Sequence, residues 1–563
     1  MKRYILSLPA MAAACIFVAM PMSAHDFESG GLFFNITSES TCEVTHPADD
    51  ATSYSGDITI PASVANGDAT LAVTAIGQQA FANAQELKSI SIPASVTRIG
   101  KDAFANDTRL KTLNIENLSA WCTTEFENMA SNPMHIRQYS TSYDCALHIN
   151  GTQVTDITIP DDVEAISPYA FVGCRPYGRL TFGNNLKTIG TAAFSWGGFK
   201  TLEIGTGLQT VGIGAFSECG LTDVCVSSLS HWCRIKFLKD PNVLVAATSN
   251  PINKPDAHPT YSPRNLIIDG ERLTNLVIPD DVTEVDGTFC GYAALESVVV
   301  PDHVTSLTPG IFQGCENLVS ASLGEGLSEI PAAAFSSDEN LTQLHIGSNV
   351  ATIGQQAFSM CYALPQVAFP KKLHTIKDQA FVHCRSITGL DFPEGLAVIE
   401  QGAFGFCSAL EYINLPESVE TIGFAAFYPN SVVRNVRSYS PNPPALASIQ
   451  APFSPDTYKL ATLSVPEGAK TAYSAAPGWK NFTNIEENLP AAITEFETTA
   501  EETVSVRIKG LTATFINLPD NATYRIHDLA GRHIISGCTA TVTLPAPGIY
   551  IISVAGSTIK IAL

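Results

Sequence analysis

Short segments in which apolar and polar residues alternate recur along most of this chain. In LTQLHIG (341–347), Leu344 and Ile346 would face one side of a strand, and Gln343 and His345 the other. Such alternation is typical of a β-strand with one buried and one exposed face. A Pro or Gly follows these segments, which predicts that the chain then turns. The pattern therefore predicts many short strands separated by turns.

The strand-like segments belong to a repeat marked by the phrase Ile-Gly-x-x-Ala-Phe. IGQQAF occurs at 76–81 and again, unchanged, at 353–358. Its phenylalanine recurs every 23 residues within three blocks, with a single interval of 22. The twelve copies are Phe81, Phe104, Phe171, Phe194, Phe216, Phe289, Phe312, Phe335, Phe358, Phe381, Phe404 and Phe427. A fixed period of this length predicts a solenoid of stacked coils, with parallel strands and with the rings filling the core between coils.

The repeat resembles the leucine-rich repeats of the BspA type, which occur on the surfaces of bacteria and some protists. The resemblance covers roughly residues 26–488 and rests on the recurrent pattern L-x-x-I-x-I-P-x-x-V-x-x-I-G-x-x-A-F-x-x-C. It implies a β-rich leucine-rich-repeat solenoid over 76–427. Residues 25–75 resemble the hairpins that cap the first coil in that family, and residues 428–488 resemble its closing segment.

Two insertions, at about 117–163 and 228–282, interrupt the repeat and resemble each other. NLSAWCTTEF (117–126) matches SLSHWCRIKF (228–237), and both insertions end in IPDDV. The phenylalanine intervals across them are 67 and 73 residues, near three repeat lengths. We therefore expect both insertions to continue the coil.

Each insertion also carries a hairpin signal. Asn150-Gly151 and Asp269-Gly270 are two-residue turns whose residues tolerate positive φ, which predicts a β-hairpin on one flank of the solenoid. The second insertion contains a polar, Pro-rich stretch, 248–263, that we expect to be an exposed loop.

The chain is acidic, with 32 Lys and Arg against 54 Asp and Glu and a formal net charge of −22. A surface of this sign repels phosphates and anionic lipid, so nucleic acid is not an expected partner.

The N-terminal residues have the features of an export signal. A basic pair precedes the apolar stretch MAAACIFVAM (11–20), and the small residues Ser23 and Ala24 offer a cleavage site. We expect residues 1–24 to be a signal peptide and the mature chain, without a transmembrane segment, to be extracellular or on the outer cell surface.

The repeat ends near residue 488. Residues 489–505 are acidic and Thr-rich, as in a linker. Short strand-like segments then predict a small antiparallel β-sandwich over 506–563. YRIHDLAGR (524–532) and GIYIISV (548–554) resemble the C-terminal sorting domain of the type IX secretion system, and a plain accessory β-sandwich is the alternative.

The 14 cysteines invite a disulfide framework in an exported chain. Six of them lie three residues after a repeat phenylalanine: Cys174, Cys219, Cys315, Cys361, Cys384 and Cys407. Side chains stacked in one column point the same way, which suits disulfide torsion poorly, so we expect buried free thiols there. Cys122 with Cys145, and Cys225 with Cys233, are the candidates for disulfides.

No catalytic or metal-binding arrangement stands out. The twelve histidines lack metal-ligand spacing, and the chain has no HExxH, GxSxG or GxxxxGK[ST] motif. His231 lies near Cys233, but the matching insertion has Ala120 and Cys122, so a nucleophile–base pair is not expected. Two carboxylate pairs could hold calcium or be solvated turn residues: Asp161-Asp162 and Asp280-Asp281. We expect no enzymatic activity, no metal and no cofactor.

Side chains that point outward from the predicted strands are mostly small or polar. Coil by coil, the middle outward position holds Ser91, Asn114, Thr158, Thr181, Glu203, Cys225, Val277, Val299, Ser322, His345, Ala368, Asp391 and Asn414. Such a face suits broad, shallow contact with a macromolecule better than capture of a small substrate. The candidate binding face consists of Ser322, His345, Ala368, Asp391, Tyr412 and Asn414.

Relatives of the BspA type are associated with adhesion to host matrix proteins and to other bacteria. The resemblance thus implies a secreted or cell-surface, monomeric repeat protein, an adhesin that binds host or bacterial surface protein or glycoprotein. The alternative is a surface carbohydrate- or nutrient-binding accessory protein of an uptake system. A surface enzyme on a repeat scaffold is disfavoured by the missing catalytic motifs.

Overall fold

The computed structural model describes residues 25–47, 54–107, 109–135, 145–176, 178–239, 251–252, 264–446 and 452–489, and seven strands between 505 and 562. The chain divides into two compact units, Met1–Ala491 and Ala492–Leu563. The expected signal peptide, and the expected linker beyond residue 489 up to residue 504, lie outside the described residues.

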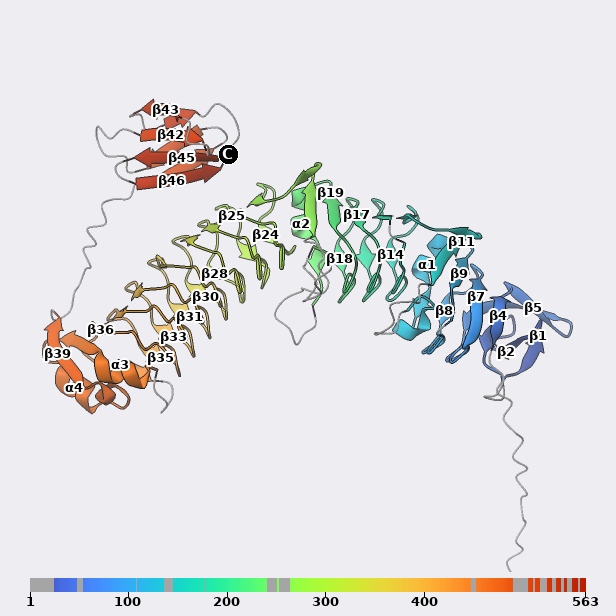
Figure 1. Cartoon of the computed structure of the whole chain (residues 1–563), viewed down its shortest axis with the longest axis horizontal. Helices are drawn as coiled ribbons and strands as arrows, with labels where there is room; N and C mark the ends of the chain where they lie inside the picture. Colours follow the sequence, from blue (N-terminus) through green and yellow to red (C-terminus); the bar gives the residue numbers. More distant parts are fainter. Residues whose placement is uncertain are drawn as a thin grey trace, which may run out of the picture. The chain divides into compact units, whose positions relative to one another are not determined.

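The first unit is a solenoid in which strands of successive coils lie side by side (Figure 1). Each regular coil except the one around Ala368 gives one strand to a first column, and neighbouring strands within each sheet of this column pair in parallel. They are β4 (Ser55–Thr59), β7 (Glu86–Ile92), β9 (Thr112–Ile115), β11 (Ala146–Ile149), β13 (Ile157–Thr158), β15 (Arg179–Thr181), β17 (Thr201–Ile204), β19 (Asp223–Val226), β21 (Asn265–Ile268), β23 (Asn275–Val277), β25 (Ser297–Val300), β27 (Ser320–Leu323), β29 (Gln343–His345), β32 (Gly389–Asp391), β34 (Tyr412–Leu415), β36 (Asn435–Ser438), β38 (Thr462–Pro466) and β39 (Asn484–Leu489).

A second column of mostly two-residue strands also pairs in parallel. It consists of β6 (Ala69–Ile76), β8 (Arg98–Ile99), β10 (Glu125–Phe126), β14 (Ala165–Ile166), β16 (Thr188–Ile189), β18 (Thr210–Val211), β20 (Lys236–Phe237), β24 (Glu284–Val285), β26 (Ser306–Leu307), β28 (Glu329–Ile330), β30 (Thr352–Ile353), β31 (Thr375–Ile376), β33 (Val398–Ile399), β35 (Thr421–Ile422) and β37 (Ala445–Leu446). The expected parallel solenoid is therefore confirmed.

The repeat phrase forms a third line of contact between coils. The Phe358 N–H donates to Ala380 O at 2.8 Å, and the Phe381 N–H donates to Ala403 O at 2.7 Å. The rings of Phe358 and Phe381 stack with centroids 5.1 Å apart. All twelve repeat phenylalanines are at most 1% exposed, so the prediction that these rings fill the core is confirmed.

Antiparallel hairpins precede the first coils. The strands are β1 (Phe27–Ser29), β2 (Leu32–Ile36), β3 (Thr41–Thr45) and β5 (Ser63–Asn66). β1 pairs with β2 and β2 with β3, whereas β3 joins β6 in parallel. Phe34 and Val44 are fully buried, so these hairpins cover apolar surface and connect to the coil stack.

Short helices and aromatic rings close the other end of the solenoid. These helices are α3 (Pro455–Leu460), α4 (Lys470–Ala475) and η2 (Trp479–Asn481). The Phe453 ring extends the stack of repeat rings, 5.3 Å from Phe427, and Trp479 and Phe482 pack edge-on against it. The last coil therefore does not end on an open apolar surface.

Both insertions continue the coil. β11 pairs in parallel with β9, and β21 pairs in parallel with β19. Helix α1 (Leu118–Thr123) or α2 (Leu229–Arg234) takes the place of the usual turn, and η1 (Met129–Ser131) follows in the first insertion.

The predicted hairpins are confirmed, whereas the exposed loop is wrong in part. β11 pairs antiparallel with β12 (Thr152–Gln153), and β21 with β22 (Glu271–Arg272). Positive φ occurs at both turns, for example 50° at Asn150 and 77° at Gly151. Pro251 and Ile252 are buried, as are Pro133 and Met134 at the matching positions of the first insertion. Residues 248–250 and 253–263 lie outside the described residues.

The cysteine column is buried as expected. The Cys384 thiol donates to Phe358 O at 3.1 Å, and the Cys407 thiol donates to Phe381 O at 3.3 Å. Each thiol thus bonds the backbone of the preceding coil. Burial raises the pKa of Cys407 to about 12, which favours the neutral thiol.

Neither candidate disulfide is present among the described residues, where Cys122, Cys145, Cys225 and Cys233 are free thiols. Cys225 lies on the outward side of β19, while Cys233 is buried within α2, so the two side chains lie on different sides of the coil wall. Cys145 is buried, and burial raises its pKa to about 12.

The second unit contains two antiparallel sheets, of three and of four strands. Their strands are β40 (Ser505–Lys509), β41 (Thr512–Ile516), β42 (Tyr524–Asp528), β43 (His533–Gly537), β44 (Thr541–Thr543), β45 (Ile549–Val554) and β46 (Ser557–Ala562). The β-sandwich and the sorting domain stay predictions, because Ile526 is the one side chain of this unit among the described residues.

Within the described part of the chain, no helix has the length and apolar character needed to cross a membrane.

Candidate binding face

The structure divides the six predicted face residues into three places. Ser322 on β27 is the direct neighbour of His345 on β29. Asp391 on β32 is the direct neighbour of Asn414 on β34, and Tyr412 lies two residues before Asn414 on the same strand. The first column is interrupted between these groups, because β29 ends one sheet and β32 begins another.

The interruption falls at Ala368, which is exposed as expected but lies outside any strand, so the prediction of a continuous strand column through it is wrong. Pro365 explains the break. One coil earlier, the Thr342 N–H donates to Val319 O at 3.0 Å, but Pro365, 23 residues later, has no N–H to donate.

Beyond the break, Asp391 holds a hydrogen-bonded network on the exposed face. The Tyr412 hydroxyl donates to Asp391 Oδ2 at 2.9 Å, and Asn414 Nδ2 donates to Oδ1 at 2.5 Å. Arg437 Nη1 donates to Asn414 Oδ1 at 3.4 Å. The hydrogen bond to Asp391 raises the pKa of Tyr412, because the protonated phenol is the form that can donate. We call Asp391, Tyr412, Asn414 and Arg437 the Asp391 network.

Gly389 makes room for this network. It lies beside Tyr412 in the parallel register, and a Cβ at Gly389 would overlap the Tyr412 ring. The phenol ring therefore lies across the strand that Gly389 begins.

Gly389 and Arg437 were missed in the sequence. The signal for both is the repeat period, since Gly389 precedes Tyr412 by 23 residues and Arg437 follows Asn414 by the same interval.

Asp162 and Asp281, in the two Pro-Asp-Asp-Val segments, each accept a hydrogen bond from a serine of a helix. Ser119 Oγ donates to Asp162 at 2.8 Å, and Ser230 Oγ donates to Asp281 at 2.7 Å. Arg234 also pairs with Asp281. Hydrogen bonding to Ser230, followed by that to Arg234, lowers the pKa of Asp281. In the part of the chain that the structure describes, no cluster of three His, Cys, Asp or Glu side chains is suited to a metal ion.

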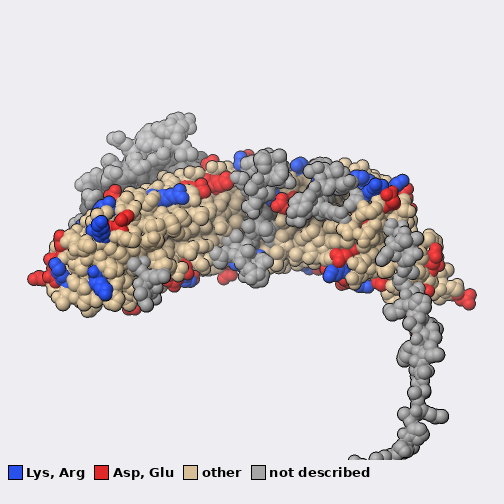
Figure 2. Space-filling view, turned by 60° about the horizontal axis from the view of Figure 1, so that its bottom comes forward, with Lys and Arg blue, Asp and Glu red and all other residues tan. Residues whose placement is uncertain are grey.

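Charged residues of both signs are scattered along the visible side of the solenoid (Figure 2).

Solved crystal structures that are similar to this chain include the following three, each less than 25% identical to it. A leucine-rich-repeat protein from Bacteroides ovatus is 22% identical, with a TM-score of 0.46, over 70% of this chain and 95% of that chain. A leucine-rich cell surface protein from Faecalibacterium prausnitzii is 21% identical, with a TM-score of 0.37, over 75% and 94%. The pneumococcal vaccine antigen PcpA is 13% identical, with a TM-score of 0.35, over 83% and 98%. Comparison with proteins of curated function gave no match.

A family model for the BspA type leucine rich repeat region, which contains six copies of the repeat, matches more than half of the chain. The matched residues are 63–141, 143–231, 268–386 and 328–441. They include nearly all of the first insertion, the two ends of the second and all four residues of the Asp391 network. The chain therefore belongs to the BspA-type leucine-rich-repeat family.

Proposed function

We propose that this protein is an exported surface repeat protein that binds a protein or glycoprotein partner through the Asp391 network. The observation that carries the proposal is the network itself. Three neighbouring coils present a phenol, a carboxylate, an amide and a guanidinium that are already joined by hydrogen bonds on an exposed sheet face.

Hydrogen bonds within the network favour binding because they restrict the side chains before a partner arrives. Ordering a flexible side chain at an interface costs about 0.5–1.5 kcal/mol, and a restricted side chain loses less. Arg437 also has further N–H donors, and a guanidinium is suited to carboxylates of a partner. A shallow face of this kind suits modest affinity, about micromolar, which corresponds to about −8 kcal/mol.

Export and the absence of enzymatic activity are parts of the same proposal. The basic and apolar N-terminal residues and membership of a family of surface repeats support export. The matched family is a repeat region rather than a catalytic domain, which supports binding as the function.

The alternative, a carbohydrate-binding accessory protein, is favoured by exposed rings at another position of the coil. Phe406 is 48% exposed, and its ring stacks on His383 with centroids 4.4 Å apart. Exposed aromatic side chains offer apolar faces and edges to sugar rings.

The test compares two double variants of the mature chain, residues 25–563. Asp391→Ala/Tyr412→Ala removes the centre of the network, and Ser322→Ala/His345→Ala is the matched control on the separate sheet. We expect the first variant to bind immobilised matrix glycoproteins and whole cells at least about tenfold more weakly, a difference of about 1.4 kcal/mol, and the control to bind like the wild type. Equal binding by all three folded proteins would remove the network from the site, and selective binding of soluble glycans would favour the alternative.

A further inference from the structure

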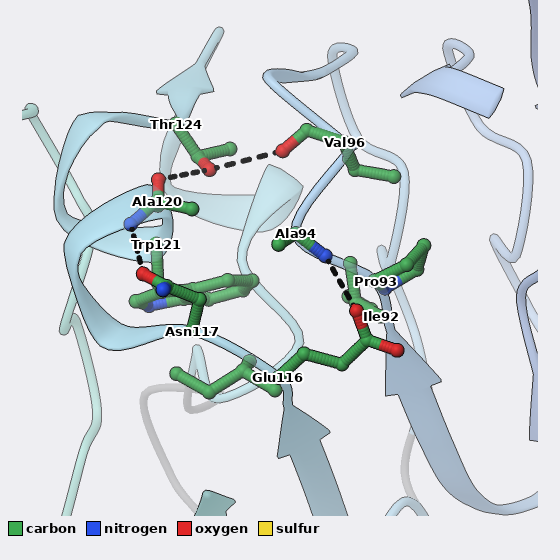
Figure 3. A pocket seen from close by; sticks show the side chains of 10 residues that line it. Ile92, Pro93, Ala94, Val96, Glu116, Asn117, Ala120, Trp121 and Thr124 are labelled. Atoms are coloured by element: carbon green, nitrogen blue, oxygen red, sulfur yellow. Dashed lines mark hydrogen bonds between the residues drawn. The ribbon is translucent and has the colours of Figure 1, made fainter. Parts of the chain in front are cut away.

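The space between the first insertion and the coil before it is too small for a ligand. Figure 3 shows Trp121 on one side of this space and Ile92, Pro93 and Ala94 on the other. The cavity volume is about 10 Å³, enough for about one water molecule. A partner larger than water can therefore contact these coils only on their outer surface.

The outer surface carries a row of bulky side chains at one position of three successive coils. Met360, His383 and Phe406 each lie two residues after a repeat phenylalanine. Met360 is 38% exposed, and Phe406 is 48% exposed. The His383 ring stacks on the Phe406 ring with centroids 4.4 Å apart. Three neighbouring coils therefore present one exposed row.

The backbone at this position makes bulky side chains unfavourable for the fold. The Met360 N–H donates to Val382 O and the His383 N–H donates to Gly405 O, both at 2.8 Å, so bonds between coils fix the local conformation. The φ angle is 62° at Met360, 65° at His383 and 58° at Phe406. This left-handed region suits glycine and asparagine, whereas a bulky side chain there is strained.

Other coils often have the residues that this conformation favours. The position holds Asn83, Asn106, Gly173, Gly291 and Gly314 in five coils, and Trp196, Glu218, Ser337 and Pro429 in four. Strained residues persist mainly at sites of function, where the strain is offset by another role. Because the row is both strained and exposed, packing of the solenoid does not account for it, and contact with a partner does.

A cation lies in the same turns, two residues further along the chain. The guanidinium carbon of Arg385 lies 4.5 Å from the centroid of the Tyr362 ring, one coil earlier. Ser386 Oγ donates to Tyr362 O at 2.7 Å and joins the two coils there. The Arg385 side chain is exposed, and no carboxylate of the described residues lies within ion-pair distance of it. The tyrosine ring therefore holds a guanidinium whose N–H donors are available to a partner.

The histidine of the row is neutral at neutral pH. Burial, and then the charge of Arg385, lower the pKa of His383 below its usual value of 6.5. Arg385 therefore carries the only full charge among Met360, Tyr362, His383, Arg385 and Phe406. We call these five residues the Phe406 patch.

We propose that the Phe406 patch binds a segment of a protein partner in which an apolar side chain lies next to a carboxylate. The apolar side chain covers Met360 and Phe406, and the carboxylate pairs with Arg385, whose planar guanidinium suits two parallel hydrogen bonds. Aromatic residues, methionine and arginine are the residues enriched at protein interfaces. The patch shares no residue with the Asp391 network, so this surface goes beyond the function proposed above.

A sugar is the less favoured occupant of the patch. Stacking of His383 on Phe406 already covers one face of each ring, whereas a sugar ring needs an open aromatic face. The unpaired Arg385 instead calls for an anionic group beside the apolar contact.

The test uses residues 25–563 with labelled methionine methyl groups, because this chain has only Met129, Met134 and Met360. The probe is the peptide acetyl-Leu-Glu-Phe-amide, and its matched control, acetyl-Leu-Gln-Phe-amide, lacks the charge. We expect the acidic peptide to bind at millimolar concentration and to shift the Met360 signal alone. It should bind about threefold more tightly than the control, as for an exposed ion pair.

Three variants separate the ring from the charge. Phe406→Gly removes the ring and relieves the left-handed strain, so it should weaken binding about fivefold or more without lowering the Tm. Glu218→Gly is the matched control, since Glu218 has the same place in its coil and a φ of 54°, and it should leave binding unchanged. Arg385→Gln should bind the two peptides equally.

A Met360 signal that does not respond to the acidic peptide, or that responds equally in Phe406→Gly, would overturn the proposal, as would equal shifts of all three methionines. A hyaluronan tetrasaccharide that shifts Met360 where the peptide does not would assign the patch to acidic glycans instead. The response should persist in Asp391→Ala/Tyr412→Ala, so failure of this proposal is distinguishable from failure of the Asp391 network.

Discussion

The two insertions share a sequence motif, a helix and a hairpin, yet they satisfy their buried polar groups differently. Trp121 Nε1 donates to Ala170 O at 2.8 Å. Trp232, its counterpart, is fully buried, and its Nε1 has no acceptor among the described residues. The next repeat phrase also differs in length between the two insertions, since Phe171 follows Ile166 by five positions whereas Phe289 follows Val285 by only four.

The coil stack therefore tolerates local exchanges of side chains as long as the coil backbone stays in register. The Ser167 N–H donates to Cys122 O, and the Gly287 N–H donates to Cys233 O, both at 2.8 Å. These equivalent bonds hold each helix to the following coil. Side chains around the helix can then change in pairs, such as Ala120 with Thr124 in one insertion and His231 with Ile235 in the other.

Removal of either tryptophan ring should have the largest effect. Trp121→Ala and Trp232→Ala should each lower the free energy of unfolding by about 3–5 kcal/mol, through lost apolar contact and a cavity. Because each coil contacts only its neighbours, the loss should be local. Hydrogen exchange should show reduced protection within about one coil of each insertion, and unchanged protection there would contradict the assignment of the rings to the core.

Asp338 gives the regular coils a pH dependence that is opposite in sign to the one that Asp281 gives helix α2. It occupies the cysteine position three residues after Phe335 and is fully buried, and burial raises its pKa well above the usual value of 3.8. Its neutral form suits the folded state, so stability is greatest below the unfolded pKa and is lost as pH rises through the folded one.

Asp338→Cys places a cysteine at this position of the cysteine column and should remove the loss of stability at high pH. Thermal unfolding from pH 4 to pH 8 should show a stabilised variant at the upper end, together with slower hydrogen exchange in the coils around residue 338. A variant that is no more stable than the wild type at pH 8 would show that the buried Asp338 carboxyl does not destabilise the folded protein at that pH.

Replacing tryptophan by phenylalanine should change the free energy of unfolding differently in the two insertions. Trp121→Phe leaves Ala170 O with one donor fewer and should cost about 1–2 kcal/mol. Trp232→Phe removes a buried N–H donor that has no acceptor among the described residues. Burying such a donor costs about 1–3 kcal/mol, so its removal should offset the stability that is lost with the smaller ring. Chemical unfolding of both variants is the measurement, and equal losses would mean that Trp232 has an acceptor after all.

The smallest effect concerns the carboxylate that holds α2. Because hydrogen bonds lower the pKa of Asp281, its contribution is present above the usual value of 3.8 and is lost as pH falls through the lowered one. Asp281→Asn should abolish this acid-induced loosening of α2, as followed by hydrogen exchange of the helix amides. Unchanged acid sensitivity in the variant would place its origin elsewhere.

The regular part of the fold was predictable because it depends on period alone. Phe381 and Cys384 recur at fixed positions, so their burial follows from the register of the coils. Ala368 was wrongly assigned to a strand. Pro365, three residues earlier, removes a backbone hydrogen bond between coils without changing the repeat period.

The site was predictable only in part. Alternation identified Asp391 and Asn414 as outward residues, but the network also needs Gly389 and Arg437, whose contribution depends on contact between coils. The exchange of Ala120 for His231 between the insertions is visible in the sequence, but the hydrogen bond of the His231 ring to Leu208 O depends on contact between coils.

The most direct test of the comparison is a crystal structure of the exchange variant Ala120→His/His231→Ala. If the two insertions are structurally equivalent, the imidazole at position 120 will donate a hydrogen bond to Val96 O. The loss of the His231 ring will then leave a cavity beside Leu208 O. An imidazole at position 120 that points into solvent, with the space at Leu208 closed by its neighbours, would contradict the account.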